Sequence, residues 1–215
     1  MDDIDIHIAV IYNHPETETA PLIGRYLENR GIEWDIYRGY EGEHPDMEDY
    51  DAVIAGGSPY FVREHRDDEW LKAEEEFFRD LYKPGLGICF AHQLIAEAYG
   101  GYTDKAVGYE KCRGPNRVYV DNEIDIFRDL PETVLVAEFH SDEVIIVPDD
   151  FHVIASSDIC RVEAMKHKSK PLYTFQFHPE WEELMKEYGE DNTHGYTILD
   201  NFIEIVKNYR EERVN

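Results

Sequence analysis

The chain has 215 residues and a formal net charge of −26, from 47 acidic and 21 basic side chains. Such a negative field repels polyanions, so we expect no binding to nucleic acid or to anionic membrane surfaces. Aromatic residues make up 13% of the chain, which argues against an intrinsically disordered protein despite the high charge.

The length fits one α/β domain spanning residues 1–215. The three cysteines, Cys89, Cys112 and Cys160, lie too far apart in the chain to indicate a disulfide framework or a metal-binding pair. The sequence has no signal peptide and no apolar run near 18 residues. We therefore expect a soluble, cytoplasmic protein whose thiols stay reduced.

The N-terminal half alternates apolar strands with amphipathic helices. Strands are predicted at Ile4 to Tyr12, Glu33 to Tyr37, Asp51 to Ala55 and Gly85 to Ile88, and helices at Glu18 to Arg30 and Asp67 to Tyr82. Gly56 and Gly57 follow the third strand directly. This alternation is typical of parallel strands that are joined by right-handed helical crossovers.

The fourth strand runs into Cys89, and a helix follows that is predicted to end at Gly100-Gly101. A strand-to-helix elbow holds its middle residue in a strained conformation and projects that side chain above the sheet. The small residues Gly87 and Ala91 allow strand and helix to approach closely. The positive end of the helix dipole favours a thiolate here. Cys89 is therefore a candidate nucleophile, although the residues alone also fit a buried core cysteine.

The C-terminal half carries short strands separated by polar turns. They are predicted at Arg117 to Val120, Val134 to Phe139, Val144 to Val147, Val153 to Ser156, Val162 to His167 and Leu172 to Phe177. An acidic, poorly periodic stretch then leads to a last helix from about Tyr196 to Arg210. The predicted fold class is α/β: an open, mostly parallel sheet flanked by helices, with additional short antiparallel strands in the C-terminal half.

A cysteine nucleophile needs a base, and the base needs a group that orients it. His178 follows an apolar strand, at the edge where sites lie in open α/β sheets. Pro179 favours extended geometry at His178, and residues i and i+2 of an extended chain face the same way. Glu180 can then accept the ring N–H of His178, although a surface turn with a solvated glutamate remains open. His178 and Glu180 have no third ligand spaced to complete a metal site.

Two motifs resemble the class I (triad-type) glutamine amidotransferase family: Gly-Ile-Cys-Phe-Ala-His-Gln around Cys89, and Phe-His-Pro-Glu around His178. The resemblance covers nearly the whole chain, with Gly56-Gly57 in the expected place. Within the family, the chain is most similar to the glutaminase subunits of archaeal-type two-subunit GMP synthases. That similarity is carried by residues 138–144, 163–167 and 198–202.

The resemblance implies a role for each matching residue. Cys89 would attack the side-chain amide carbon of L-glutamine, His178 would act as base and acid, and Glu180 would orient His178. The remaining implied contacts are to the substrate. The backbone N–H groups of Gly57 and Phe90 would bind the oxyanion, Gln93 would line the glutamine pocket, and the backbone around Ser141 and Asp142 would hold the α-amino and α-carboxyl end.

The resemblance implies a glutaminase that needs no cofactor and passes ammonia to a separate ATP-pyrophosphatase synthetase subunit that aminates XMP. The chain has no Ser-Gly-Gly-x-Asp-Ser pyrophosphate loop, so ATP and XMP would bind the partner. Two alternatives remain open. One is a stand-alone γ-glutamyl hydrolase or peptidase on the same scaffold. The other is a catalytically silent binding module, with Ala91, where the family usually has glycine, as a first sign of decay.

Overall fold

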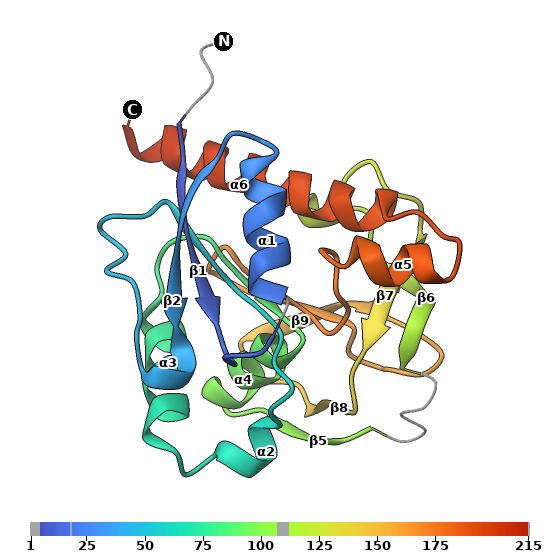
Figure 1. Cartoon of the computed structure of the whole chain (residues 1–215), viewed down its shortest axis with the longest axis horizontal. Coiled ribbons are helices and arrows are strands. Elements are labelled where there is room, and N and C mark those ends of the chain that lie inside the picture. The colour runs from blue at the N-terminus through green and yellow to red at the C-terminus, as the bar shows by residue number, and fades with distance from the viewer. Residues whose placement is uncertain (1–4, 18, 107–111, 215) are drawn as a thin grey trace.

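The computed structural model describes residues 5–17, 19–106 and 112–214. Within these residues nine strands form one sheet in the order β2-β1-β3-β4-β11-β10-β9-β6-β7, and β5 pairs with β8 in a small second sheet (Figure 1). The strands are β1 (His7–Tyr12), β2 (Glu33–Arg38), β3 (Ala52–Ala55), β4 (Gly85–Ile88), β5 (Tyr102–Lys105), β6 (Arg113–Val120), β7 (Thr133–Phe139), β8 (Asp142–Ile146), β9 (Phe151–Ser156), β10 (Ala164–His167) and β11 (Leu172–Phe175).

The two halves of the large sheet differ in strand direction. From β2 to β11 every neighbouring pair is parallel. From β11 to β7 every neighbouring pair is antiparallel. The predicted α/β class is confirmed, and the antiparallel strands of the C-terminal half extend the parallel sheet at one edge. The strand β11 joins the two halves because it pairs with β4 on one side and β10 on the other.

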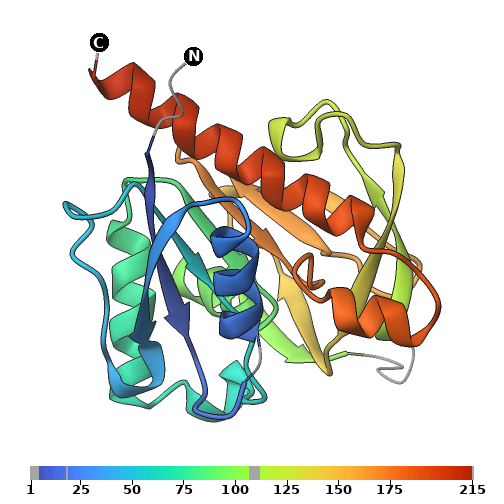
Figure 2. The same cartoon turned by 45° about the horizontal axis from the view of Figure 1, so that its top comes forward.

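Helices cover both faces of the sheet. The helices are α1 (Thr19–Glu28), α2 (Val62–His65), α3 (Glu69–Asp80), α4 (Phe90–Ala98), α5 (Glu182–Glu187) and α6 (Thr193–Val214). Figure 2 shows α1 and the long α6 lying across one face of the sheet. The helices α3 and α4 pack on the opposite face, where their apolar side chains meet those of β1, β3 and β10.

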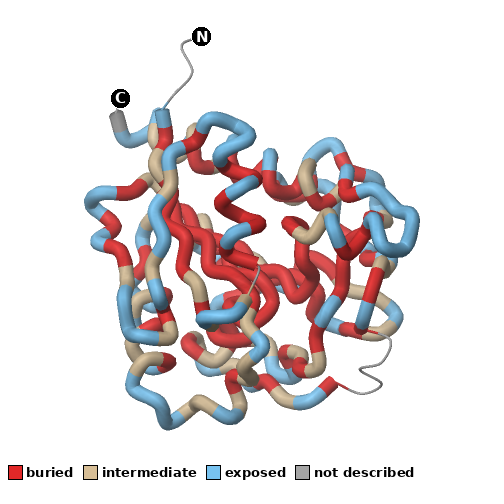
Figure 3. The backbone as a smooth tube through the Cα atoms, viewed as in Figure 1, coloured by how far each residue is buried: buried red, intermediate tan, exposed pale blue. Residues whose placement is uncertain are grey.

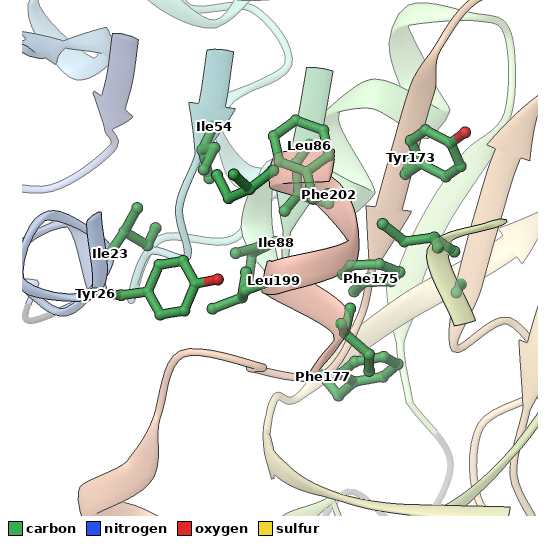
Figure 4. Close-up of a cluster of buried hydrophobic side chains, with 14 of the residues drawn as sticks. Ile23, Tyr26, Ile54, Leu86, Ile88, Tyr173, Phe175, Phe177, Leu199 and Phe202 are labelled. Atoms are coloured by element: carbon green, nitrogen blue, oxygen red, sulfur yellow. The ribbon is translucent and has the colours of Figure 1, made fainter. Parts of the chain in front are cut away.

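Two apolar layers therefore lie on the two faces of the sheet. Because side chains alternate along a strand, neighbouring residues of one strand belong to different layers. In β1, Ile8 and Val10 belong to the layer under α1 and α6, whereas Ala9 and Ile11 belong to the layer under α3 and α4. Figure 3 shows the central strands buried, with the exposed backbone at the periphery. Figure 4 shows part of the first layer, with these side chains grouped by element: Ile23 and Tyr26 of α1, Leu199 and Phe202 of α6, Ile88 of β4 and Phe175 of β11.

Most predicted elements are present, with bounds that shift by a few residues. The strand β6 begins at Arg113 instead of Arg117, and α6 extends from Thr193 to Val214. The predicted starts at Ile4 and Glu18 lie outside the described residues. Among the described α-helices and strands, α2, β5 and α5 were not predicted, nor were the short 3-10 helices at Gly39–Glu41 and Asp125–Phe127. The stretch after His178, expected to be irregular, contains α5 because Leu184 and Met185 pack against Ala137.

Candidate active site

Three adjacent parallel strands end at one edge of the sheet and carry the candidate site. Gly56 and Gly57 follow β3, Cys89 follows β4, and His178 lies three residues beyond the end of β11. The register pairs Ala55 with Gly87 and Phe175 with Ile88, so the three chain segments leave the sheet at nearly the same level. Residues remote in sequence thus meet at the carboxyl edge of the sheet, the usual place for a site in this class of fold.

Cys89 occupies the elbow between β4 and α4. Its φ of 53° and ψ of −101° lie in a region that residues other than glycine rarely adopt. Such a conformation costs on the order of 1–3 kcal/mol and is found mostly at functional sites. Gly87 makes the turn feasible, because a Cβ at this position would lie 2.5 Å from the Cδ1 atom of Ile95 and 3.1 Å from the carbonyl oxygen of Ala91.

His178 and Glu180 form a buried pair, as the i and i+2 geometry predicts. The Nδ1 atom of His178 lies 2.8 Å from Oε1 of Glu180, and both side chains are almost completely shielded from solvent. The backbone N–H of His178 donates to the carbonyl of Ala137, which ties the segment after β11 to β7. The ring is therefore held both by its own backbone and by Glu180.

Gly57 lies where the His178 ring and Cys89 meet. A Cβ on Gly57 would lie 2.8 Å from Cε1 of His178 and 3.4 Å from Cβ of Cys89. Burial by itself would lower the pKa of His178. The Glu180 carboxylate and the Cys89 side chain outweigh that effect and raise the pKa to about 10. A ring that is protonated at neutral pH stabilises a thiolate next to it.

Two cavities meet at Cys89. The first has a volume of about 220 Å³, and Cys89, Phe90, Gln93, Ser141 and Asp142 are part of its lining. The second, of about 280 Å³, lies on the side of His178 and is lined in part by Thr19 and Trp181. A larger hollow of about 490 Å³ beside Arg30 and Asp200 contains none of the predicted site residues. Size alone would therefore select the wrong site.

Two backbone N–H groups belong to residues next to Cys89: Phe90 follows it in the chain, and Gly57 lies beside it in the fold. Phe90 is the first residue of α4, so its N–H has no acceptor within the helix. The N–H of Gly57 has no acceptor among the described residues. The carbonyl of Gly57 is fixed by the hydroxyl of Thr19, which donates to it at 3.1 Å. Within the described residues, no hydrogen bond from either N–H group is found.

The structure adds polar residues that the sequence did not single out. Gln176 is completely buried, and its Nε2 donates to the sulfur of Cys89 at 3.8 Å. Gln93, the predicted pocket residue, donates from Nε2 to the carbonyl of Asp142 at 2.8 Å and to Oε1 of Gln176 at 3.1 Å. Arg63 forms an ion pair of 2.8 Å with the buried carboxylate of Asp142. The sequence did hold one signal for Gln176: it lies two residues before His178, and residues i and i+2 of an extended chain face the same way.

Other histidines have local roles. The Nδ1 atom of His14 accepts from the backbone N–H of Glu16, which makes it a turn residue. His92 is buried and bonded to the hydroxyl of Thr174 at 2.7 Å, and burial lowers its pKa to about 3. Within residues 5–17, 19–106 and 112–214, no group of three His, Cys, Asp or Glu side chains is placed to hold a metal ion. The described helices include none with the length and apolar character needed to cross a membrane.

The family model described as glutamine amidotransferase class-I matches residues 16–203. A glutamine-hydrolysing GMP synthase subunit from Methanocaldococcus jannaschii is 48% identical over 122 residues, which are 57% of this chain and 60% of that protein. The corresponding protein from Archaeoglobus fulgidus is 35% identical over 204 residues, 93% of this chain and 98% of that protein. A solved structure from Thermoplasma acidophilum, assigned as a candidate for the same GMP synthase subunit, has a TM-score of 0.83. It is 31% identical and covers 99% of this chain and 100% of its own.

Proposed function

Because the chain belongs to the class-I glutamine amidotransferase family, we propose that it hydrolyses L-glutamine to glutamate and ammonia through a Cys89–His178–Glu180 triad. This is a family of cysteine-dependent enzymes. The observation that carries the proposal is a strained cysteine at a strand-to-helix elbow, next to a buried His–Glu pair and open to two cavities. We further propose that residues 1–215 form one amidotransferase domain.

In the first half of the reaction, the Cys89 thiolate attacks the side-chain amide carbon of glutamine. The carbonyl electrons move to the oxygen, which is stabilised by the N–H groups of Gly57 and Phe90. Two such donors are worth roughly 3–4 kcal/mol each in related acyl-transfer sites. His178 then donates its proton to the departing nitrogen, and ammonia leaves a γ-glutamyl thioester on Cys89.

In the second half, His178 accepts a proton from water, and the resulting hydroxide attacks the thioester carbon. The tetrahedral intermediate collapses, glutamate leaves, and the sulfur departs as a thiolate beside the reprotonated ring. Glu180 holds the tautomer and orientation of His178 through both halves, as the 2.8 Å contact supports. No cofactor takes part in these steps. The thiol must stay reduced, which fits the cytoplasmic location expected from the sequence.

The substrate is proposed to bind in the cavity of about 220 Å³, with its amide toward Cys89. Its α-amino and α-carboxyl end then lies against the backbone around Ser141 and Asp142. Gln93 holds this segment in place by donating a hydrogen bond to the carbonyl of Asp142. The second cavity lies on the side of His178, the group that protonates the leaving nitrogen. We assign that side to the departure of ammonia.

The acceptor of ammonia is proposed to be a separate ATP-pyrophosphatase synthetase that converts XMP to GMP. The relatives named above support this, since each carries the name of a GMP synthase subunit or of a candidate for one. Ammonia is wasted if hydrolysis runs alone, so glutaminase turnover should be low for the isolated chain and rise when the synthetase is added. The test is ammonia release with and without the synthetase subunit of a GMP synthase. Full activity of the isolated chain would contradict the partner assignment.

One observation favours the hydrolase alternative as a second candidate function. The cavity beside His178, of about 280 Å³, is larger than ammonia requires and has Trp181 in its wall. A γ-glutamyl alkylamide could place its amine there and be cleaved by the same triad. Comparison of kcat/KM for L-glutamine and γ-glutamyl methylamide separates the two candidates. A preference for glutamine supports the amidotransferase, and a preference for the alkylamide supports the hydrolase.

A further inference from the structure

A buried hydrogen-bond path reaches the Cys89 sulfur and involves neither His178 nor Glu180. It begins at Gln176, the residue after β11, whose side chain is completely buried. Backbone hydrogen bonds fix both residues of this contact. The Cys89 N–H donates to the carbonyl of Phe175 at 2.7 Å, and the Gln176 N–H donates to the carbonyl of Glu163 at 2.8 Å. The Nε2 atom of Gln176 then lies 3.8 Å from the sulfur.

The orientation of the Gln176 amide is set by its second contact. Its Oε1 accepts from Nε2 of Gln93 at 3.1 Å. If the amide were flipped, two NH₂ groups would face each other and the sulfur would face an oxygen. Gln93 is fixed in turn, because it also donates to the carbonyl of Asp142 at 2.8 Å. Among the described residues, the Gln176 amide N–H group therefore has the Cys89 sulfur as its acceptor.

The far end of the path is anchored by charge. His140 donates from Nδ1 to the same Asp142 carbonyl at 3.0 Å, and its Nε2 lies 3.0 Å from Oε2 of Glu138. Both side chains are at most 1% exposed. Because Nδ1 donates to a carbonyl and Nε2 lies beside a carboxylate, the imidazolium form of His140 suits both neighbours. The Asp142 carbonyl thus receives two donors, one of them charged, and this holds Gln93 in place.

We propose that Gln176 is a catalytic residue that donates a hydrogen bond to the Cys89 sulfur, and that Gln93 and His140 are positioning residues that act through it. The proposal rests on the proposed function, in which Cys89 is the nucleophile. When the thioester forms, the negative charge leaves the sulfur and this hydrogen bond weakens. When the thioester is hydrolysed, the sulfur leaves as a thiolate and the bond strengthens. Gln176 therefore promotes the departure of the sulfur.

The test compares Gln176→Leu with a matched control, Thr174→Val. Thr174 is buried in β11, two residues before Gln176, and its hydroxyl contacts His92 instead of the sulfur. The first readout is the rate of Cys89 alkylation by iodoacetamide at pH 7, which needs no glutamine. A hydrogen bond to a charged group corresponds to roughly 10- to 100-fold. The Gln176 donor favours the thiolate, which is the form that reacts with iodoacetamide. We therefore expect Gln176→Leu to slow alkylation about tenfold and Thr174→Val to change it less than about twofold.

The second readout is glutamine turnover with the synthetase present. Gln176→Leu should lower kcat and raise the fraction of enzyme trapped as the γ-glutamyl thioester, measured by mass spectrometry of quenched reactions. Gln176→Glu keeps the shape of the side chain and places an acceptor at the sulfur. Gln176→Glu replaces Gln176→Leu in both measurements if the leucine variant does not fold. It should slow alkylation at least as much as Gln176→Leu.

Wild-type alkylation rates in a folded Gln176→Leu or Gln176→Glu variant would overturn the proposal, as would an equal loss in Thr174→Val. Failure of the proposed function gives a different pattern. In that case wild-type Cys89 would be alkylated but no glutamine would be hydrolysed, even with the synthetase. The alkylation rates would still decide whether Gln176 acts on the sulfur.

Discussion

Two buried groups in this fold contain the same three residue types. The cavity cluster is Cys89, His178 and Glu180. The closed cluster, named for its completely buried sulfur, is Cys112, His140 and Glu138, of which His140 lines the cavity of about 220 Å³. In both, a histidine nitrogen lies within 3.0 Å of a glutamate oxygen. Burial opposes protonation in both rings. The pKa of His140 is nevertheless raised by Cys112 and Glu138, as that of His178 is raised by Glu180 and Cys89.

The two clusters differ in access to the sulfur. Cys89 lies at a positive-φ elbow at the start of a helix and lines two cavities. Cys112 is completely buried just before β6 and lines neither of these cavities. A cysteine next to an imidazolium and a carboxylate is therefore not enough to make a reactive site. The backbone must also present the sulfur to a space that a substrate can enter, and in this chain the elbow does so.

The largest expected contrast comes from removing each sulfur. Cys89→Ala should lower glutamine turnover by about 10⁴-fold or more, since it removes the proposed nucleophile. Cys112→Ala should leave kcat/KM within a few fold and lower the free energy of unfolding by about 1 kcal/mol. Both are measured with the synthetase present, together with urea unfolding. Comparable activity loss in the two variants would break the distinction between the clusters.

The second contrast removes each carboxylate. Glu180→Gln should lower kcat roughly 10²- to 10⁴-fold, as the matching change does in other triads, and should lower the pKa of His178, read by NMR titration of the ring. Glu138→Gln should change kcat/KM less than about tenfold and lower the free energy of unfolding by about 3 kcal/mol. If Glu138→Gln had the larger effect on kcat, the catalytic assignment would pass to the closed cluster.

The third contrast affects stability alone and concerns a buried glutamate that has no histidine partner. Glu74 is completely buried against Asn13, and burial raises its pKa to about 8. The folded state keeps this proton to higher pH than the unfolded state. The stability that protonated Glu74 contributes to the folded state is therefore fully present below about pH 4.5 and is lost as pH rises through 8. Glu74→Gln removes the dependence. From pH 5 to 8 its stability relative to wild type should rise by at most about 1.4 kcal/mol per unit. The measurement is urea unfolding of wild type and Glu74→Gln at each pH. If the two free energies of unfolding differed by the same amount from pH 5 to 8, the prediction would be contradicted.

The sequence was informative where local pattern determines structure. The apolar run Gly85 to Ile88 followed by Cys89 predicted the strand-to-helix elbow. The sequence of His178, Pro179 and Glu180 predicted a pair on one face, and the pair is present at 2.8 Å. Both features depend on neighbours within a few residues. Because sites in open α/β sheets lie at the carboxyl ends of the strands, these distant segments could be assigned to one site before the strand order was known.

The sequence was not informative where a polar residue depends on a distant partner. Glu138 and Glu74 resemble solvated acids in an acidic chain, yet both are completely buried. Gln176 contacts Cys89, which is 87 residues away; its position two residues before His178 indicates a shared face but does not identify the sulfur as its partner. The helix α5 is similar, since its burial depends on Ala137 of β7. These features follow from strand order and packing, which periodicity does not encode.

The most direct test of the central claim is covalent labelling with a diazoketone analogue of L-glutamine, followed by mass spectrometry of all three cysteines. All three are free thiols, and they differ in access, since Cys89 lines both cavities whereas Cys112 and Cys160 line neither. We expect stoichiometric labelling of Cys89, protection by added glutamine, and no label on Cys112 or Cys160. An unlabelled Cys89 at neutral pH would contradict the account and favour a catalytically silent module, and equal labelling of Cys112 would remove the distinction between the two clusters.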